Sequence, residues 1–160
     1  MQTNNKNNNE TQNIPKNTQA FKSNITAHVF RLLPDTDLYT ELTNYIKTHK
    51  IKAACILSCV GSLKEINIRL ASGKTFLTKK ENFEIISLVG CISEERNHIH
   101  ISLSDDKGNA FGGHLMPENN LVYTTAEIII GEFPELVFQQ EQCEKSTWPE
   151  LVVVEKTKDD

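Results

Sequence analysis

The sequence predicts an α+β fold, a mostly antiparallel β-sheet with a single helix. Two observations lead to this class. Eight or nine segments rich in β-branched residues follow one another between residues 25 and 160, separated by Gly, Pro, Asn or Asp. Only residues 36–50 carry apolar residues at helical spacing. A chain of 160 residues fits one such domain with short extensions.

The two ends differ from the middle in composition. Residues 1–20 consist mainly of Asn, Gln, Thr and Lys. Because they hold very few apolar side chains, burial cannot offset the entropy lost on ordering, and we expect a disordered Asn-rich tail. The domain is expected over residues 21–143. Residues 144–160 form a C-terminal extension, either an edge strand or a loose charged tail.

The first two elements are a strand and the helix. Residues 25–33 alternate as a strand does, until Pro34 and Asp35 end it. In residues 36–50, Leu38, Leu42 and Ile46 recur every four residues, and basic side chains near the end suit the helix dipole.

The middle of the chain predicts three further strands. Residues 53–62 form a continuous apolar run closed by Gly61, the pattern of a strand buried on both faces. Residues 64–72 alternate and are expected to pair with that run. Residues 82–93 form a long strand, whose Gly90 indicates a bulge or a close backbone approach.

The remaining strands follow in quick succession. Residues 98–105 alternate cleanly, and the turn at 105–109 makes them a hairpin with residues 109–116. Residues 124–133 are the most β-prone run, and residues 134–140 form a shorter strand.

Composition argues against several functions and compartments. The net charge of −4 and scattered basic residues, with the densest group in a solvated turn at Lys74, Lys79 and Lys80, do not favour binding to a phosphate backbone. The four cysteines form no close CxxC pair, and the chain lacks a signal-like or membrane-spanning apolar run. We expect a cytoplasmic protein that does not bind membranes, with nuclear entry as an alternative.

Three histidines form the most promising chemical cluster. Residues two apart on a strand point the same way, so His98 and His100 share one face. The hairpin turn carries His114 back beside them, and Gly112 and Gly113 would let backbone or a ligand come close. Three neutral imidazoles are a plausible Zn²⁺ ligand set that leaves a fourth position open. The alternative is ordinary polar surface.

Three carboxylates are candidates for a catalytic base beside such a metal: Glu84, Glu127 and Asp105. Glu84 and Glu127 each interrupt an apolar strand, where an unpaired carboxylate would be costly, so we favour a structural ion pair with Arg31 over catalysis for both. The sequence carries no Ser-His-Asp signature, GxGxxG motif or phosphate loop, so nucleophile-type mechanisms have no support. We favour a binding module, and a metal-dependent enzyme stays open as the alternative.

Several motifs in order resemble one known family, the PPC domain (DUF296) of prokaryotes and land plants. The resemblance covers about residues 25–140, through HVFRLLPDTDL, AACILSCVGSLKEINIRL, NFEIISLVGCIS, HIHISLSDDKGNAFGGHL and TTAEIIIGEF. It implies a sheet wrapped around one helix, assembly as a homotrimer, and a metal site, usually zinc, at His98, His100 and His114. Plant members carry an Arg-Gly-Arg-Pro AT-hook for the DNA minor groove, which this chain lacks.

Three functions remain open at this point. The first is a trimeric, zinc-binding module for a small ligand or a protein partner. The second is a metal-dependent hydrolytic enzyme, and the third is a DNA-associated regulator related to the plant AT-hook proteins.

Overall fold

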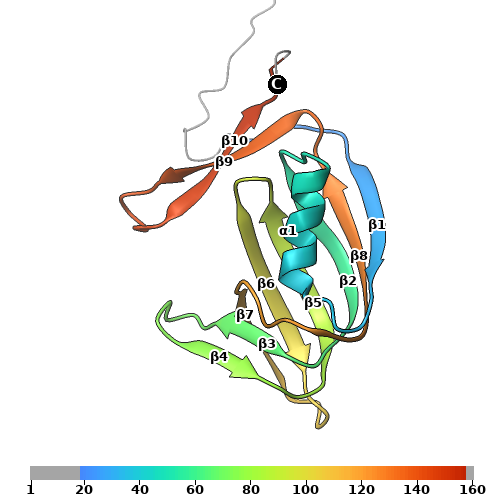
Figure 1. The fold of residues 1–160 in the computed structure, drawn as a ribbon. Helices are drawn as coiled ribbons and strands as arrows, with labels where there is room; N and C mark the ends of the chain where they lie inside the picture. The colour runs from blue at the N-terminus through green and yellow to red at the C-terminus, as the bar shows by residue number, and fades with distance from the viewer. Residues whose placement is uncertain (1–18, 158–160) are drawn as a thin grey trace, which may run out of the picture.

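The structure, a computed structural model, describes residues 19–157. These residues form one helix and ten strands, and every strand pair is antiparallel (Figure 1). The fold class expected from the sequence is therefore confirmed. The elements are β1 (Thr26–Leu32), α1 (Leu38–Thr48), β2 (Ala54–Leu63), β3 (Ile66–Arg69), β4 (Phe76–Lys79), β5 (Phe83–Ile92), β6 (Asn97–Ser104), β7 (Ala110–Leu115), β8 (Val122–Glu132), β9 (Leu136–Gln142) and β10 (Pro149–Glu155).

Helix α1 packs on one face of an eight-stranded sheet, whose strand order is β1-β8-β2-β5-β6-β7-β3-β4 (Figure 1). Asp37 caps the helix by accepting a hydrogen bond from the Thr40 backbone N–H at 2.9 Å. Leu38, Leu42 and Ile46 are fully buried against the sheet, so this stripe holds the helix in place.

The topology corrects one expected pairing. Residues 53–62 and 64–72 were expected to pair with each other, but β2 lies between β8 and β5, whereas β3 lies between β7 and β4. Only Lys64 and Glu65 separate β2 from β3, and the chain continues into the other part of the sheet instead of reversing. This continuation brings β3 beside β7, the strand that carries His114.

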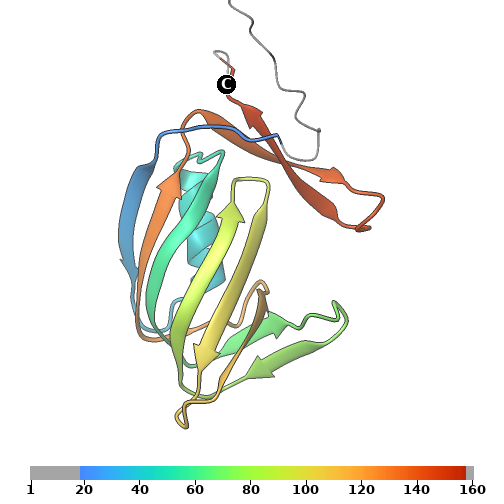
Figure 2. The same ribbon diagram turned by 180° about the vertical axis from the view of Figure 1, so that it is seen from behind.

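The face of the sheet opposite α1, which we call the outer face, carries several exposed apolar side chains. Figure 2 looks onto it from the side away from the helix. Five large apolar side chains of β1, β2 and β5 are at least half exposed there: Val29, Leu57, Val60, Ile86 and Val89. The expectation that residues 53–62 are buried on both faces is therefore wrong for a single chain, in which only the helix-side face is covered.

Glycine is required where neighbouring strands come very close. Gly90 meets β6 so closely that a Cβ would lie 2.5 Å from the His98 carbonyl oxygen, which confirms the close approach expected there. Gly61 has φ +146°, and a Cβ would lie 2.0 Å from the Thr125 carbonyl oxygen of β8. No side chain fits at either position without moving backbone.

Replacing Gly61 with alanine is expected to cost about 3 kcal/mol or more of unfolding free energy, because strain and a backbone clash add. Gly108→Ala is the matched control, since Gly108 also has positive φ (+80°) but has nothing within 4 Å of the added Cβ. Its expected cost is about 1–2 kcal/mol. Urea denaturation measures both, and equal losses would contradict the clash at Gly61.

The C-terminal residues form a hairpin at one end of the main sheet. Strands β9 and β10 make a separate two-stranded sheet, so the extension is a strand rather than a loose tail (Figure 1). Leu136 and Phe138 pack with Ala53 in a small second core. The Phe138 N–H donates to the Lys52 carbonyl at 2.9 Å, and the Ser93 hydroxyl donates to the Phe138 carbonyl at 3.2 Å. These contacts fix the hairpin near the start of β6.

Two remaining expectations concern the termini and membranes. The tail predicted for residues 1–20 falls, apart from Gln19 and Ala20, outside the described residues. Within residues 19–157, no helix has both the length and the apolar character needed to cross a membrane.

Candidate metal site

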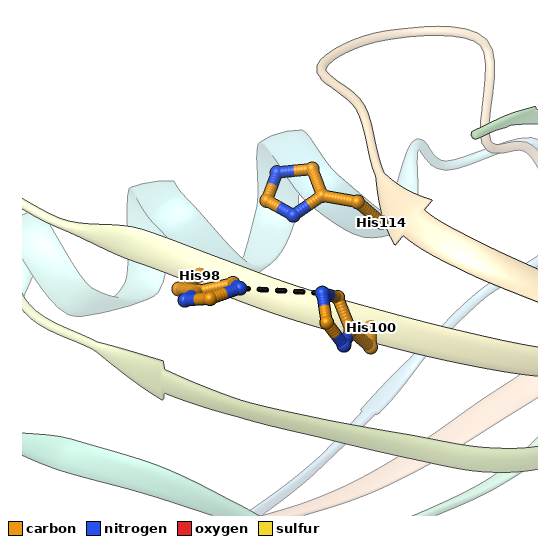
Figure 3. A group of neighbouring side chains, drawn as sticks. All are labelled: His98, His100 and His114. Atoms are coloured by element: carbon orange, nitrogen blue, oxygen red, sulfur yellow. Dashed lines mark hydrogen bonds between the residues drawn. The ribbon is translucent and has the colours of Figure 1, made fainter. Parts of the chain in front are cut away.

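The three histidines come together on the outer face of the sheet. One ligand atom from each of His98, His100 and His114 lies within 4.8 Å of the others. The Nε2 atoms of His98 and His100 are 3.2 Å apart, and a ring nitrogen of His114 faces the space between them (Figure 3). The geometric grouping expected from the sequence is present.

Strand alternation and register produce this grouping. Ile99 and Ile101 point into the core, so His98 and His100 project from the opposite face of β6. In the β6–β7 hairpin, His114 lies directly opposite His100. The turn expected at residues 105–109 joins these strands, with Asp105 accepting hydrogen bonds from the backbone N–H groups of Lys107 and Asn109.

Gly112 and Gly113 have a backbone reason to be glycine. A Cβ at Gly112 would lie 2.3 Å from the Ile101 carbonyl oxygen, and one at Gly113 would lie 2.6 Å from that of Arg69. Both glycines also line a hollow beside His100 and His114, so they leave room next to the imidazoles.

One nitrogen pair of the cluster has the spacing of a tetrahedral ion, and the three ligand atoms together lie within 4.8 Å. Two nitrogens at 2.0–2.1 Å from one tetrahedral Zn²⁺ are about 3.3–3.4 Å apart, close to the 3.2 Å between His98 Nε2 and His100 Nε2. His114 Nδ1 is buried and has no hydrogen-bond partner, an arrangement that costs free energy unless the lone pair is used. Zn²⁺ accepts such lone pairs, and three protein ligands leave a fourth position open.

The surroundings favour neutral imidazoles. Burial, followed by the positive charge of Arg69, lowers the pKa of His114 to about 4. The pKa of His98 is also lowered, first by burial and then by the charges of His100 and Arg96. Because a metal binds the neutral form of histidine, these two ligands need not lose a proton near pH 7.

Acidification is expected to destabilise the metal-stripped protein more than a His114→Gln variant. Between pH 6.5 and about 4, an unfolded His114 binds a proton that the folded state excludes, so stability falls as the pH falls through this window. Urea midpoints at pH 7 and pH 5 measure the effect. An identical loss in both proteins would contradict the low pKa of His114.

Two arginines that were not among the site residues expected from the sequence adjoin the cluster. Arg69 lies opposite His114 in the β3–β7 register. Arg96 donates from Nη2 to His98 Nδ1 at 3.1 Å. The position of Arg96 could have been predicted from the sequence. Arg96, His98 and His100 are spaced two residues apart, which places all three side chains on one face of an extended segment. No such signal exists for Arg69, whose position depends on the pairing of distant strands.

The proposed catalytic carboxylates lie elsewhere. Glu84 is opposite Ser104 at the far end of the β5–β6 pair, and Glu127 is on β8, three strands away from β6. Asp105 belongs to the β6–β7 turn, five residues beyond His100, roughly 16 Å along a strand. The carboxylates that share a cavity with His98 and His114 are Glu95 and Glu150.

The ion pair expected for Arg31 is also corrected. Arg31 and Glu127 are directly opposite in the β1–β8 register, but no ion pair of residues 19–157 joins Arg31 to Glu127 or to Glu84. All three side chains are exposed. The premise of a buried, costly carboxylate was wrong, because each strand has one uncovered face.

Comparison with known proteins identifies the family. A model of the Plants and Prokaryotes Conserved (PCC) domain matches residues 19–134. The chain belongs to the PCC domain family. Strands β9 and β10, which begin at Leu136, lie beyond the matched region of the PCC domain.

Curated relatives of this PCC domain are much longer proteins. The bifunctional protein GlmU of two Synechococcus strains is 36% identical over 121 residues, which cover 76% of this chain and 19% of each relative. The chain therefore spans about a fifth of the length of those relatives.

Solved structures share the fold. A hypothetical protein of Salmonella is 32% identical with a TM-score of 0.84, covering 87% of this chain and 100% of that one. A plant- and prokaryote-conserved protein of Pyrococcus horikoshii is 27% identical with a TM-score of 0.67, covering 88% and 99%. A metal-containing protein of Archaeoglobus fulgidus is 24% identical with a TM-score of 0.72, covering 84% and 99%, a likeness of fold alone.

Proposed function

We propose that this PCC domain is a homotrimeric module that binds zinc through His98, His100 and His114 and presents the open side of the metal to a small ligand or a protein partner. The observation that carries the proposal is the meeting of three imidazole nitrogens within 4.8 Å on rigid, paired strands. The metal-containing protein of Archaeoglobus fulgidus, which has the same fold, supports it.

Zinc suits this site for chemical reasons. Nitrogen ligands in tetrahedral geometry suit Zn²⁺, whereas Mg²⁺ and Ca²⁺ prefer six or more oxygen ligands. All three side-chain donors here are imidazole nitrogens. When bound, zinc would supply an electron-pair acceptor at its fourth position. The chain's own residues hold the imidazoles in place, because the paired strands β6 and β7 carry all three histidines.

The outer face supports the trimer. A strand that is apolar on both faces is expected to be covered on both faces, but in one chain Leu57 and Val60 are half exposed. Contiguous apolar surface on a folded domain is typical of an assembly interface. Val89 lies directly opposite His100, so the metal site borders the surface that three copies would bury.

A binding module is favoured over a hydrolytic enzyme, because none of the three carboxylates first considered as a base lies beside the imidazoles. The net charge of −4 favours a small ligand or protein partner over DNA. The four free cysteines are typical of a reducing compartment, which supports a cytoplasmic location.

Elemental analysis of the purified protein tests the metal. We expect about one zinc per chain in the wild type and almost none in a His98→Ala, His100→Ala double variant. Equal zinc contents in the two proteins would end the proposal.

A further inference from the structure

A cavity of about 380 Å³ opens beside the metal site, between the main sheet and the C-terminal hairpin. His98 and His114 form part of its wall, together with Arg69 and Arg96. Trp148 and Glu150 close it from the hairpin side. The cavity therefore combines two metal-binding imidazoles, two guanidinium groups and one indole ring.

Arg96 presents donors that lack acceptors. The residue is 9% exposed, and its Nη1 donates to the Pro149 carbonyl at 2.9 Å. Its Nε is buried without a hydrogen-bond partner. Nε and Nη2 form the edge of a guanidinium that can bind both oxygens of a carboxylate. Only Nη2 of this edge has a partner, His98 Nδ1.

Metal binding would remove that last partner. An arginine only donates, so His98 Nδ1 must accept, which places the proton of the neutral ring on Nε2. Zinc at Nε2, the atom that faces His100, would require the proton on Nδ1 instead. The N–H groups of Arg96 Nη2 and His98 Nδ1 would then face each other as two donors. The Nε–Nη2 edge of Arg96 would need an acceptor from another group.

Arg69 is the second cation without a carboxylate partner. None of the ion pairs within residues 19–157 includes it. Its guanidinium carbon lies 5.0 Å from the centre of the Trp148 ring, a cation–π contact that leaves the outer N–H donors available. The same side chain lines both this cavity and the hollow over Gly112 and Gly113.

We propose that the cavity binds a small organic carboxylate, which accepts hydrogen bonds from the guanidinium groups of Arg69 and Arg96 and places its apolar part along Trp148. The inference rests on the proposed function, because zinc binding is what frees Arg96. A dianion such as phosphate is disfavoured, since Glu95 and Glu150 also line the cavity and would repel a second negative charge.

Trp148 makes the proposal directly measurable. It is the only tryptophan in the chain, so its fluorescence reports on this cavity alone. Benzoate serves as the probe, because it joins a carboxylate to a flat apolar ring. Benzamide has the same shape without the charge, and inorganic phosphate has the charge without the ring. Isothermal titration calorimetry provides a second readout for all three.

Benzoate is expected to change the Trp148 emission saturably and to bind zinc-loaded protein about tenfold more tightly than metal-free protein. Benzamide and phosphate are expected to bind at least about tenfold more weakly than benzoate. Arg69→Gln should weaken benzoate binding about tenfold, and Arg69→Lys should restore part of it. Lys74→Gln is the matched control, since it removes an exposed charge outside the cavity and should change nothing.

The outcomes separate this inference from the metal proposal. A zinc-loaded protein that binds benzamide or phosphate as well as benzoate, or an Arg69→Gln variant with unchanged affinity, would overturn the inference and leave the metal site standing. A protein without zinc would contradict the proposed function. In that case Arg96 would keep its hydrogen bond to His98, and Arg69-dependent benzoate binding would support a cavity that holds the carboxylate through Arg69 alone. The absence of saturable benzoate binding would overturn the inference as well.

Discussion

Zinc added to the metal-stripped protein is expected to raise its Tm by roughly 10 °C or more, and His100→Ala is expected to remove most of that rise. A ligand that binds only the folded state stabilises it by about 4 kcal/mol at 1,000 times its Kd, and each kcal/mol shifts the Tm of a domain of this size by a few degrees. His100 is exposed, so its loss should leave the fold intact.

Thermal unfolding with and without zinc provides the measurement. The matched control is His49→Ala, which removes an exposed imidazole at the end of α1, outside the cluster. This variant should keep the full zinc-induced rise. An unchanged rise in His100→Ala would contradict the assigned ligand set.

Val60→Lys is expected to convert a trimer into monomers of 18.1 kDa. Val60 is 55% exposed on the outer face in one chain, and a trimer that covers this face would have to bury the new ammonium group. Within the chain, the lysine would lie opposite Glu127, an opposite-charge pair that the monomer tolerates. Loss of the trimer in Val60→Lys would therefore report on assembly rather than on folding of the single chain.

Sedimentation velocity measures the mass of both forms. Phe76→Lys is the control, because Phe76 is equally exposed but lies on β4, at the far edge of the sheet. It should leave the assembly unchanged. A wild-type protein that sediments as a monomer, or a Val60→Lys variant that stays trimeric, would contradict the proposed interface.

The local parts of the site could be predicted from the sequence. Alternation placed His98 and His100 on one face, and the turn chemistry around Asp105 and Asn109 placed His114 opposite them. These inferences needed only neighbouring residues. The helix could be predicted for the same reason, since Asp37 and the Leu38, Leu42 and Ile46 stripe are local signals.

The non-local parts could not be predicted. Arg69 reaches His114 only because β3 joins β7 rather than β2, and Trp148 reaches the cavity only because the hairpin packs against the end of the sheet. Alternation does not say which strands pair. It also does not say whether an apolar face is covered by the chain itself, which is why Glu84 and Glu127 were expected to be buried and are exposed.

Anomalous diffraction at the zinc absorption edge, from crystals of the full chain grown with zinc, tests the metal site most directly. We predict one strong peak per chain, at about 2.0–2.1 Å from one nitrogen of each of His98, His100 and His114. A peak bound by other residues, or three imidazoles with no peak between them, would contradict the central claim.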